Sequence, residues 1–188
     1  MSVFYLVRHA HADWTPDENR SLSARGYADA ERVADILQPY PIGAIYCSPF
    51  RRARETIAPL ATRLGLPVRI APELQERQLG HRATRGFLEM VAATWRDPSF
   101  AHPAGESNAA AQRRGLGLVR QLQERRVAEH IVLSTHGNLM ALILQGFDAA
   151  VDFAFWKSLT MPDIYTLRFS KVDEPVMGRL WREIESGW

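Results

Sequence analysis

The stretch at residues 3–9 constrains the fold of this chain more than any other. Residues 3–7, Val-Phe-Tyr-Leu-Val, form an apolar run that is mostly β-branched or aromatic, and they lead directly into Arg8 and His9. Such a run is typical of a strand that is buried on both faces of a covered sheet. Ligands of open α/β sheets bind beyond the carboxyl ends of the strands, so Arg8 and His9 stand where a binding site is expected. An Arg-His pair in an ordinary surface loop is the alternative, and this stretch alone does not exclude it.

Short apolar stretches alternate with amphipathic helical patterns along the rest of the chain. We expect further strands at 42–47, 67–70, 131–134, 163–169 and 176–184, the last two as an edge hairpin. We expect helices at 23–38, 51–64, 84–95, 105–128 and 139–144. This alternation predicts a three-layer α/β/α fold with a mostly parallel central sheet. The 188 residues contain no linker or repeat, so we expect residues 1–188 to form a single domain.

The composition narrows the class of function. The net charge is +2, from 23 basic and 21 acidic residues, which argues against a broad basic surface for nucleic acid. No apolar run approaches the ~20 residues of a membrane span. The N-terminus lacks the basic and apolar pattern of a secretion signal, so we expect a cytoplasmic protein. The single cysteine, Cys47, is expected to be a small buried residue at the end of a strand.

Three predicted strands end in residues of similar chemistry. Arg8 and His9 end the first, a pair of arginines follows the second, and His136 and Gly137 end a later one. Because the carboxyl ends of parallel strands lie along one edge of a sheet, we expect these residues to meet in one crevice. Together they predict an anion site, to which backbone N–H groups at the start of the helix after His136 would contribute. A single histidine or arginine at such a place is usually structural or solvated, but three matching strand ends are hard to explain by chance.

Several segments resemble the motifs of the histidine phosphatase superfamily, also called the phosphoglycerate mutase-like proteins, and they follow one another along the chain in the same order as in that family. The segment at 6–10 is similar to its Arg-His-Gly signature, with Ala10 in place of Gly. The segment at 48–56 is similar to its Ser-Pro-Leu-x-Arg-Ala-x-x-Thr motif, which aligns the catalytic arginine with Arg52 rather than Arg51. Further similarities are Leu-Ser-x-x-Gly at 22–26, Leu-x-Glu-x-x-x-Gly at 74–80, Gly-Glu-Ser at 105–107 and the second histidine motif at 134–137. The resemblance covers most of the chain and implies the phosphoglycerate mutase-like fold.

The resemblance also implies roles for the residues at these motifs. His9 would attack phosphorus and carry the phosphoryl group as a phosphohistidine. Arg8, Arg52 and His136 would hold the phosphate oxygens, with the arginines as forked donors and His136 in its charged form. Glu76 stands at the place of the family's acid, where it would protonate the leaving oxygen and then activate water. A surface carboxylate in a charged loop is the alternative for Glu76.

Gly137 and Thr15 complete the expected substrate site. Gly137 would offer a backbone N–H at the start of a helix, and Thr15 stands about where many family members carry an Asn that helps to choose the substrate. Arginines and histidines handle the phosphate charge, so we expect neither a metal nor a cofactor. The only group that suggests a metal lacks helical or Cys-based ligand spacing, and it consists of His9, His11, Asp13 and His81.

Two departures from the family pattern bear on the reaction. Ala10 keeps the backbone carbonyl that could orient His9, so we expect activity to survive there. No mutase-like insertion follows Glu76, and a short, open lid suits hydrolysis better than the reorientation of an intermediate. We therefore expect a metal-independent phosphatase acting on phosphate monoesters or phosphohistidine. A cofactor-dependent phosphoglycerate mutase-type phosphotransferase and a non-catalytic phosphate-binding or scaffold protein stay as alternatives.

The sequence leaves the substrate open between a small phosphorylated metabolite and a phosphoprotein, and it leaves a homodimer open as well. Charged loop residues are mostly exposed, so we expect solvated side chains at three arginines that could otherwise reach a second anionic group. These are Arg77, Arg82 and Arg85. Three aromatic residues could line an apolar pocket, although places in or over the core are the stronger expectation. These are Trp14, Phe87 and Trp95.

Overall fold

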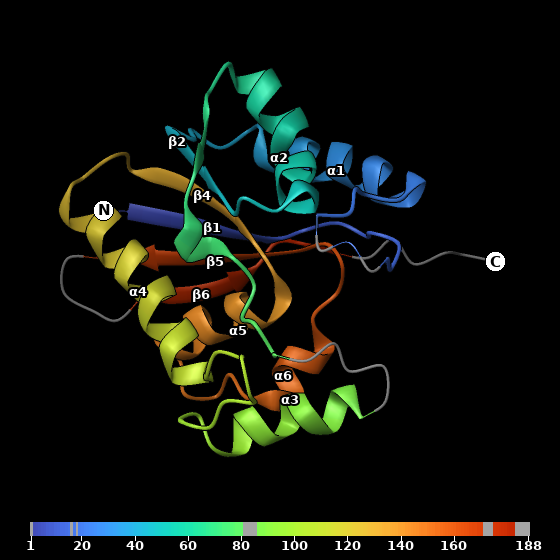
Figure 1. Cartoon of the computed structure of the whole chain (residues 1–188). Coiled ribbons are helices and arrows are strands. Elements are labelled where there is room, and N and C mark those ends of the chain that lie inside the picture. Colours follow the sequence, from blue (N-terminus) through green and yellow to red (C-terminus); the bar gives the residue numbers. More distant parts are fainter. Residues whose placement is uncertain (1, 16, 18, 81–85, 171–174, 183–188) are drawn as a thin grey trace.

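The computed structural model describes residues 2–15, 17, 19–80, 86–170 and 175–182. These residues form one six-stranded sheet with helices packed on both of its faces (Figure 1). The strands are β1 (Ser2–Arg8), β2 (Ala44–Cys47), β3 (Val68–Ile70), β4 (His130–Thr135), β5 (Asp163–Phe169) and β6 (Val176–Arg179). The helices are α1 (Ala24–Leu37), α2 (Arg51–Leu64), α3 (Phe87–Arg96), α4 (Asn108–Glu124), α5 (Gly137–Gln145) and α6 (Phe153–Ser158), with a short 3-10 helix, η1 (Pro72–Leu74), after β3.

β1 lies inside the sheet, whose strand order is β3-β2-β4-β1-β5-β6. The first four strands of this order pair in parallel, and β5 pairs antiparallel with both of its neighbours, β1 and β6. The pairing of β1 with β4 runs from Val3 opposite His130 to Arg8 opposite Thr135, so these two strands end together. The predicted three-layer α/β/α fold with a mostly parallel sheet is confirmed.

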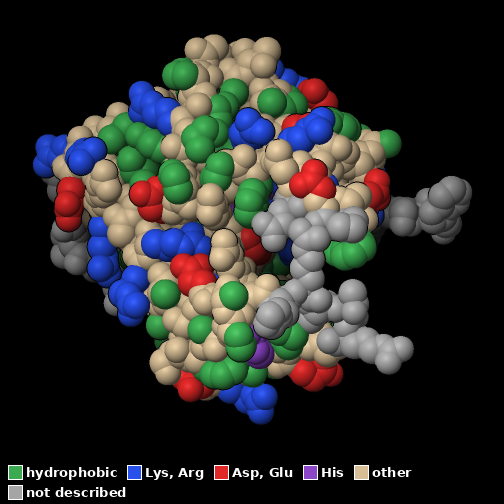
Figure 2. Space-filling view, in the orientation of Figure 1, with side chains coloured by type: hydrophobic (Ala, Val, Ile, Leu, Met, Phe, Trp, Pro, Cys, Tyr) green, Lys and Arg blue, Asp and Glu red, His purple; other side chains and the backbone are tan. Residues whose placement is uncertain are grey.

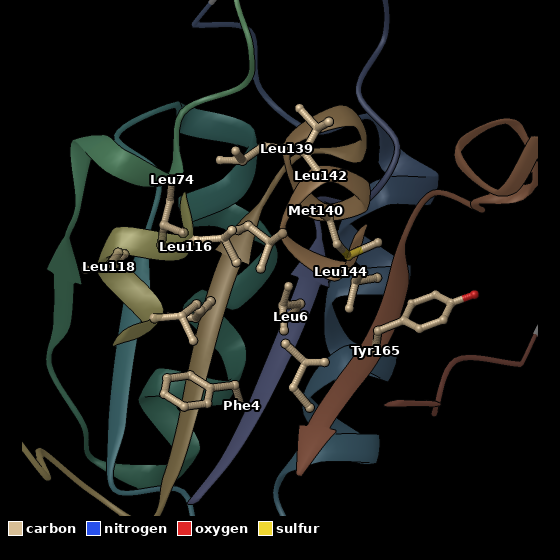
Figure 3. Packing of buried hydrophobic residues seen from close by; sticks show 14 of the residues in the cluster. Phe4, Leu6, Leu74, Leu116, Leu118, Leu139, Met140, Leu142, Leu144 and Tyr165 are labelled. Carbon is tan, nitrogen blue, oxygen red and sulfur yellow. The ribbon is translucent and has the colours of Figure 1, made fainter. Parts of the chain in front are cut away.

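The side chains of β1 alternate between two apolar clusters, one on each face of the sheet. Phe4 and Leu6 pack into the cluster under α4 and α5 (Figure 3). Tyr5 and Val7 pack into the cluster under α1 and α2. None of the four is more than 2% exposed, which confirms the prediction of a strand buried on both faces. Burying apolar surface stabilises the folded chain by about 25 cal/mol per Å², so the burial of β1 holds the polar residues that follow it in a fixed position.

α4 is shorter than the helix expected at 105–128. It begins at Asn108 because the Ser107 side chain accepts a hydrogen bond from a backbone N–H three residues later and caps the helix. It also ends earlier than expected, at Glu124. Arg126, two residues later, takes a positive φ of 46°, at which the chain has left the helix. Gly105 and Glu106 therefore belong to the loop before α4.

The tail differs from its expectation in one strand and one helix. β5 matches the expected strand at 163–169, and β6 pairs with it as an edge hairpin. β6 ends at Arg179, so the expected strand at 176–184 is too long, and its residues 183 and 184 lie outside the described ranges. No pattern predicts α6, which has six residues and is capped by the Asp152 side chain. A helix of that length shows too few turns for a period to be visible.

The surface carries charges of both signs and some exposed aromatic side chains. On the face drawn in Figure 2, basic side chains lie among acidic and apolar ones. Trp14 and Phe87 are 69% and 47% exposed, so the expectation of core or cover places is wrong for these two. Trp95 instead packs against the cluster under α4 and α5. None of the helices in the described ranges combines the length and the apolar character that crossing a membrane requires.

Candidate active site

The carboxyl ends of β1, β2 and β4 meet at one edge of the sheet. The backbone N–H of His9 donates to the carbonyl of Thr135 over 3.0 Å, and that of Ser48 donates to the carbonyl of Ser134 over 2.9 Å. These two bonds continue the sheet by one residue beyond the strands. The imidazole rings of His9 and His136 have centroids 5.1 Å apart. Three segments that are distant in the chain therefore contribute one polar cluster, as the strand-end rule predicts.

Arg52, in the first turn of α2, joins the two histidines. It is 6% exposed, its Nε donates to Nε2 of His9 over 3.1 Å, and its Nη2 donates to Nδ1 of His136 over 3.1 Å. A guanidinium can only donate, so both of these ring nitrogens accept. Arg51 lies at the surface instead, where its Nε pairs with Glu55. The structure thus places Arg52, and not Arg51, against the histidines.

These contacts fix the tautomer of His9. Its Nδ1 lies 2.8 Å from the carbonyl oxygen of Ala10 and carries the proton of this bond, because Nε2 accepts from Arg52. Burial lowers the pKa of His9 well below its usual 6.5, and the charge of Arg52 lowers it further. His9 is thus neutral, with an electron pair on Nε2 that faces the guanidinium. The substitution of the signature glycine by Ala10 leaves the orienting carbonyl in place.

His136 is fully buried and neutral in the opposite tautomer. Its Nδ1 accepts from Arg52, so Nε2 carries the proton and donates to the Ser48 hydroxyl over 2.8 Å. Burial lowers the pKa of His136 well below 6.5, and the neighbouring His9 and Arg52 lower it further. The charged form that the sequence favours for His136 would need a dianion beside it to offset this burial.

Arg8 reaches the same cluster from the end of β1. Its Nη1 donates to the carbonyls of Leu159 and Thr160 over 2.9 and 3.1 Å, and burial lowers its pKa from the usual value. Its Nε is buried and has no hydrogen-bond partner among the described residues. Gly137 makes room for this side chain, since a Cβ there would lie 2.9 Å from both Cζ and Nε of Arg8. The expected donation from the N–H of Gly137 to phosphate stays a prediction.

Glu76 lies at the N-terminus of α5. Its Oε2 accepts from the N–H of Asn138 over 3.1 Å, and its Oε1 accepts from the N–H groups of Leu139 and Arg77 over 3.0 and 2.9 Å. The charge of this carboxylate raises the pKa of Arg8, although burial lowers that pKa by more. We expected the backbone N–H groups at the start of this helix to face a phosphate, but the N–H of Asn138 is bound to Glu76. The role of Glu76 as the acid stays a prediction.

The described side-chain contacts of Thr15 and His11 lie within the segment between β1 and α1. Thr15 is exposed, and its hydroxyl donates to the carbonyl of Asp17 over 3.3 Å, so its role in substrate choice stays a prediction. Nδ1 of His11 lies 2.8 Å from the Ser23 hydroxyl and 4.0 Å from the Asp13 carboxylate. No three His, Cys, Asp or Glu side chains of the described part are grouped so that they could hold a metal ion, and His81 lies outside that part.

Two further arginines belong to this region. Arg20 is among the cations that lower the pKa of His9, with a smaller effect than burial has. The buried Nε of Arg20 has no hydrogen-bond partner in the described ranges. Its position in the loop directly after β1 is a signal that could have identified it. Arg77 is 5% exposed, and its Nε and Nη1 are buried without a described partner, so the expectation of a solvated side chain is wrong. Arg82 and Arg85 lie outside the described residues.

The sequence model of the histidine phosphatase superfamily (branch 1) matches residues 4–173. An uncharacterised protein of Mycobacterium tuberculosis (strain CDC 1551 / Oshkosh) is 42% identical over 80 residues, which make up 41% of this chain and 37% of that protein. The glucosyl-3-phosphoglycerate phosphatase of Mycolicibacterium vanbaalenii is 29% identical over 158 residues, which cover 73% of this chain and 70% of the relative. The adenosylcobalamin/alpha-ribazole phosphatase of Escherichia coli (strain K12) is 25% identical, over 81% of this chain and 82% of the relative.

Solved structures of phosphatases share the fold. The mycobacterial glucosyl-3-phosphoglycerate phosphatase in complex with VO3 superposes with a TM-score of 0.76 at 23% identity, over 95% of this chain and 97% of that one. A phosphoserine phosphatase mutant of Entamoeba histolytica in complex with phosphoserine superposes with a TM-score of 0.78 at 19% identity, over 96% and 97%. At sequence identities of 23% and 19%, these superpositions show a shared fold alone.

Proposed function

The chain belongs to the histidine phosphatase superfamily, and we propose that it hydrolyses phosphate monoesters without a metal, through a phosphohistidine on His9. The observation that carries this proposal is the state of His9. Its Nδ1 proton is held by the carbonyl of Ala10, and its Nε2 electron pair faces Arg52. A phosphate bound by Arg52 would meet that electron pair. Two of the relatives named above carry the names of phosphatases, and they support the same class of reaction.

In the first step, Nε2 of His9 attacks phosphorus, and the bond between phosphorus and the ester oxygen breaks. Arg52 exchanges its two histidine acceptors for phosphate oxygens, and the buried Nε of Arg8 adds a further donor. These donors offset the negative charge on the phosphoryl oxygens in the transition state. Once Arg52 has turned to the phosphate, Nδ1 of His136 is free to take a proton, which the dianion favours, and to donate it to phosphate.

Glu76 supplies the proton that the leaving oxygen takes, and it later removes a proton from the attacking water. The bond between phosphorus and Nε2 of His9 then breaks, inorganic phosphate leaves, and His9 returns to its neutral form. Such acid-base help is worth about 10²–10⁴-fold in rate. The position of Glu76 at the N-terminus of α5, the helix that directly follows His136, supports this role.

The substrate that we propose is a small phosphorylated metabolite. Two relatives are named for small molecules of this kind, as a glucosyl-3-phosphoglycerate phosphatase and an adenosylcobalamin/alpha-ribazole phosphatase. Arg20 and Arg77 contribute buried nitrogens without described partners near the site, and this favours an anionic substrate.

The test is hydrolysis of a panel of phosphate esters in EDTA, by the wild type and by His9→Ala. We expect the wild type to turn over and His9→Ala to be inactive, and the ranking of the panel would indicate the substrate. His11→Ala is the matched control, because His11 lies in the same loop but contacts Ser23. We expect it to stay active.

Four other outcomes would contradict the proposal or a part of it. Activity that is absent in EDTA and restored by a divalent metal would exclude the metal-independent mechanism. Transfer between phosphoglycerates in place of hydrolysis would favour the mutase-type alternative. Binding of phosphate esters without turnover would favour a non-catalytic binding protein, and turnover of phosphoproteins alone would overturn the metabolite assignment.

A further inference from the structure

We propose that Glu106 and Arg114 are positioning residues that hold the proposed acid, Glu76, in its working place. The inference rests on the proposed function. It gives a role to the Gly-Glu-Ser segment at 105–107, which the reaction steps above do not use.

Arg114, on α4, binds Glu106 with two parallel hydrogen bonds. Nε donates to Oε1 and Nη2 donates to Oε2, both over 2.8 Å. The two side chains are 23% and 24% exposed, so the pair is largely shielded from water. A forked, shielded pair of this kind is stronger and more directional than an ordinary surface ion pair. The Glu106 carboxylate therefore fixes the orientation of the Arg114 guanidinium.

The remaining nitrogen of Arg114 binds the turn that carries Glu76. Nη1 donates to the carbonyl of Glu73 over 2.6 Å and to the carbonyl of Gln75 over 2.9 Å. Gln75 directly precedes Glu76 in the chain. A single guanidinium thus joins the Glu106 carboxylate to the backbone next to the acid.

The same turn is held at two more carbonyls. The Thr135 hydroxyl, at the end of β4, donates to the carbonyl of Leu74 over 2.8 Å. The backbone N–H of Glu106 donates to the carbonyl of Gln78 over 2.7 Å, on the other side of Glu76. The backbone is therefore fixed both before and after the acid.

Two glycines let the loops approach closely enough for these bonds. A Cβ at Gly80 would lie 2.4 Å from the carbonyl oxygen of Pro103, and one at Gly105 would lie 2.8 Å from that of Leu79. Gly80 also has a φ of 96°, which L-residues with a side chain rarely adopt. The loops that carry the Leu-x-Glu-x-x-x-Gly and Gly-Glu-Ser motifs are therefore in direct backbone contact. Glu76 lies on one of them, and Glu106, the partner of Arg114, lies on the other.

The chemical consequence is selective for one step. A displaced acid slows the departure of a poor leaving group, which needs a proton, but hardly affects a good one, which does not. The rate constant kcat/KM covers the steps up to the departure of the alcohol and is therefore the quantity to compare. A loss of folding would lower kcat/KM for every substrate alike.

The experiment compares kcat/KM for p-nitrophenyl phosphate and for glycerol 2-phosphate in Glu106→Gln and Arg114→Lys. We expect a loss of about tenfold or more for glycerol 2-phosphate and of less than about threefold for p-nitrophenyl phosphate. Arg113→Lys is the matched control, because Arg113 is exposed on the same turn of α4, and we expect it to match the wild type. If Arg114→Lys fails to fold, the milder Glu106→Gln carries the test alone.

The double variant Glu76→Gln/Glu106→Gln separates positioning from general support. If Glu106 acts through Glu76, the double variant loses no more on glycerol 2-phosphate than Glu76→Gln does. Equal losses on both substrates, additive losses in the double variant, or wild-type rates in Glu106→Gln would each overturn the inference. A wild type that is inactive, or a His9→Ala variant that stays active, would instead overturn the proposed function.

Discussion

Arg52 donates to both histidines from one guanidinium, whereas its neighbour Arg51 lies at the surface and pairs with Glu55. A lysine at position 52 has one ammonium group and cannot reproduce the two directed nitrogens. Each hydrogen bond to a charged group is worth ~1.5–3 kcal/mol, and ~1.4 kcal/mol corresponds to a factor of ten. We therefore expect Arg52→Lys to lower kcat/KM by about 100-fold or more.

Arg51→Lys is the control for this prediction in steady-state kinetics. It keeps the charge and the surface position, so we expect kcat/KM to change by less than about twofold. Equal losses in the two variants would contradict the assignment of Arg52 as the group that holds phosphate.

The two buried histidines predict a pH dependence of stability. The pKa values of His9 and His136 are lowered well below 6.5 in the folded protein, mainly by burial. Below pH 6.5 the unfolded chain therefore binds protons that the folded protein does not bind. The free energy of unfolding is at its full value above pH 6.5 and falls below it, by up to ~1.4 kcal/mol per pH unit for each histidine.

Urea denaturation between pH 7 and pH 5, in buffers without phosphate, measures this dependence. The variant His9→Asn/His136→Asn should lose less stability over the interval than the wild type does. Equal slopes in the two proteins would mean that these histidines are not held neutral by burial.

At the residue scale, the motif positions could be predicted from the sequence, and the burial of charge could not. His9, Arg52 and His136 follow buried strands, and the carboxyl-end rule brings such residues together. The burial of the Nε atoms of Arg20 and Arg77 depends on the packing of the folded chain, and local composition says little about that. The tautomer of His9 likewise depends on Arg52, which lies far along the chain.

At the scale of elements, two glycines of α4 predict opposite effects on stability. A Cβ at Gly115 would lie 2.7 Å from Cγ1 of Ile143 on α5, whereas one at Gly117 would meet no described atom within 4 Å. We expect Gly117→Ala to stabilise the protein by about 0.5–1 kcal/mol, because alanine favours a helix. We expect Gly115→Ala to destabilise it by about 1–3 kcal/mol, because the core is overpacked.

Urea denaturation of both variants checks this pair, and each serves as the control for the other. Stabilisation by both substitutions would contradict the close packing of α4 on α5, and destabilisation by both would contradict the open position of Gly117.

The spacing of apolar residues predicted where most helices and strands lie, because an element that buries one face or both faces needs apolar residues at regular positions. The ends of elements were less predictable. The start of α4 depends on one hydrogen bond that the Ser107 side chain accepts, whereas the sequence pattern placed the start at Gly105. α6 was missed because it spans fewer than two turns of helix.

At the scale of the whole molecule, the parallel part of the sheet places the ends of β1, β2 and β4 together, and this much follows from the alternation of strands and helices. The contact between the loop at 74–80 and the loop at 103–107 does not follow from this alternation, because no general rule governs which loops meet. The sequence showed both motifs but not that they touch.

Trapping the phosphohistidine on His9 tests the proposed mechanism at its covalent intermediate. Wild type and Glu76→Gln are mixed with p-nitrophenyl phosphate in EDTA, quenched in base, digested, and analysed by mass spectrometry. We predict one phosphoryl group on the peptide that contains His9, at higher occupancy in Glu76→Gln, where water is activated less well, and none in His9→Ala. Turnover by the wild type with no phosphoryl group on the protein, or with the group on another residue, would contradict this mechanism.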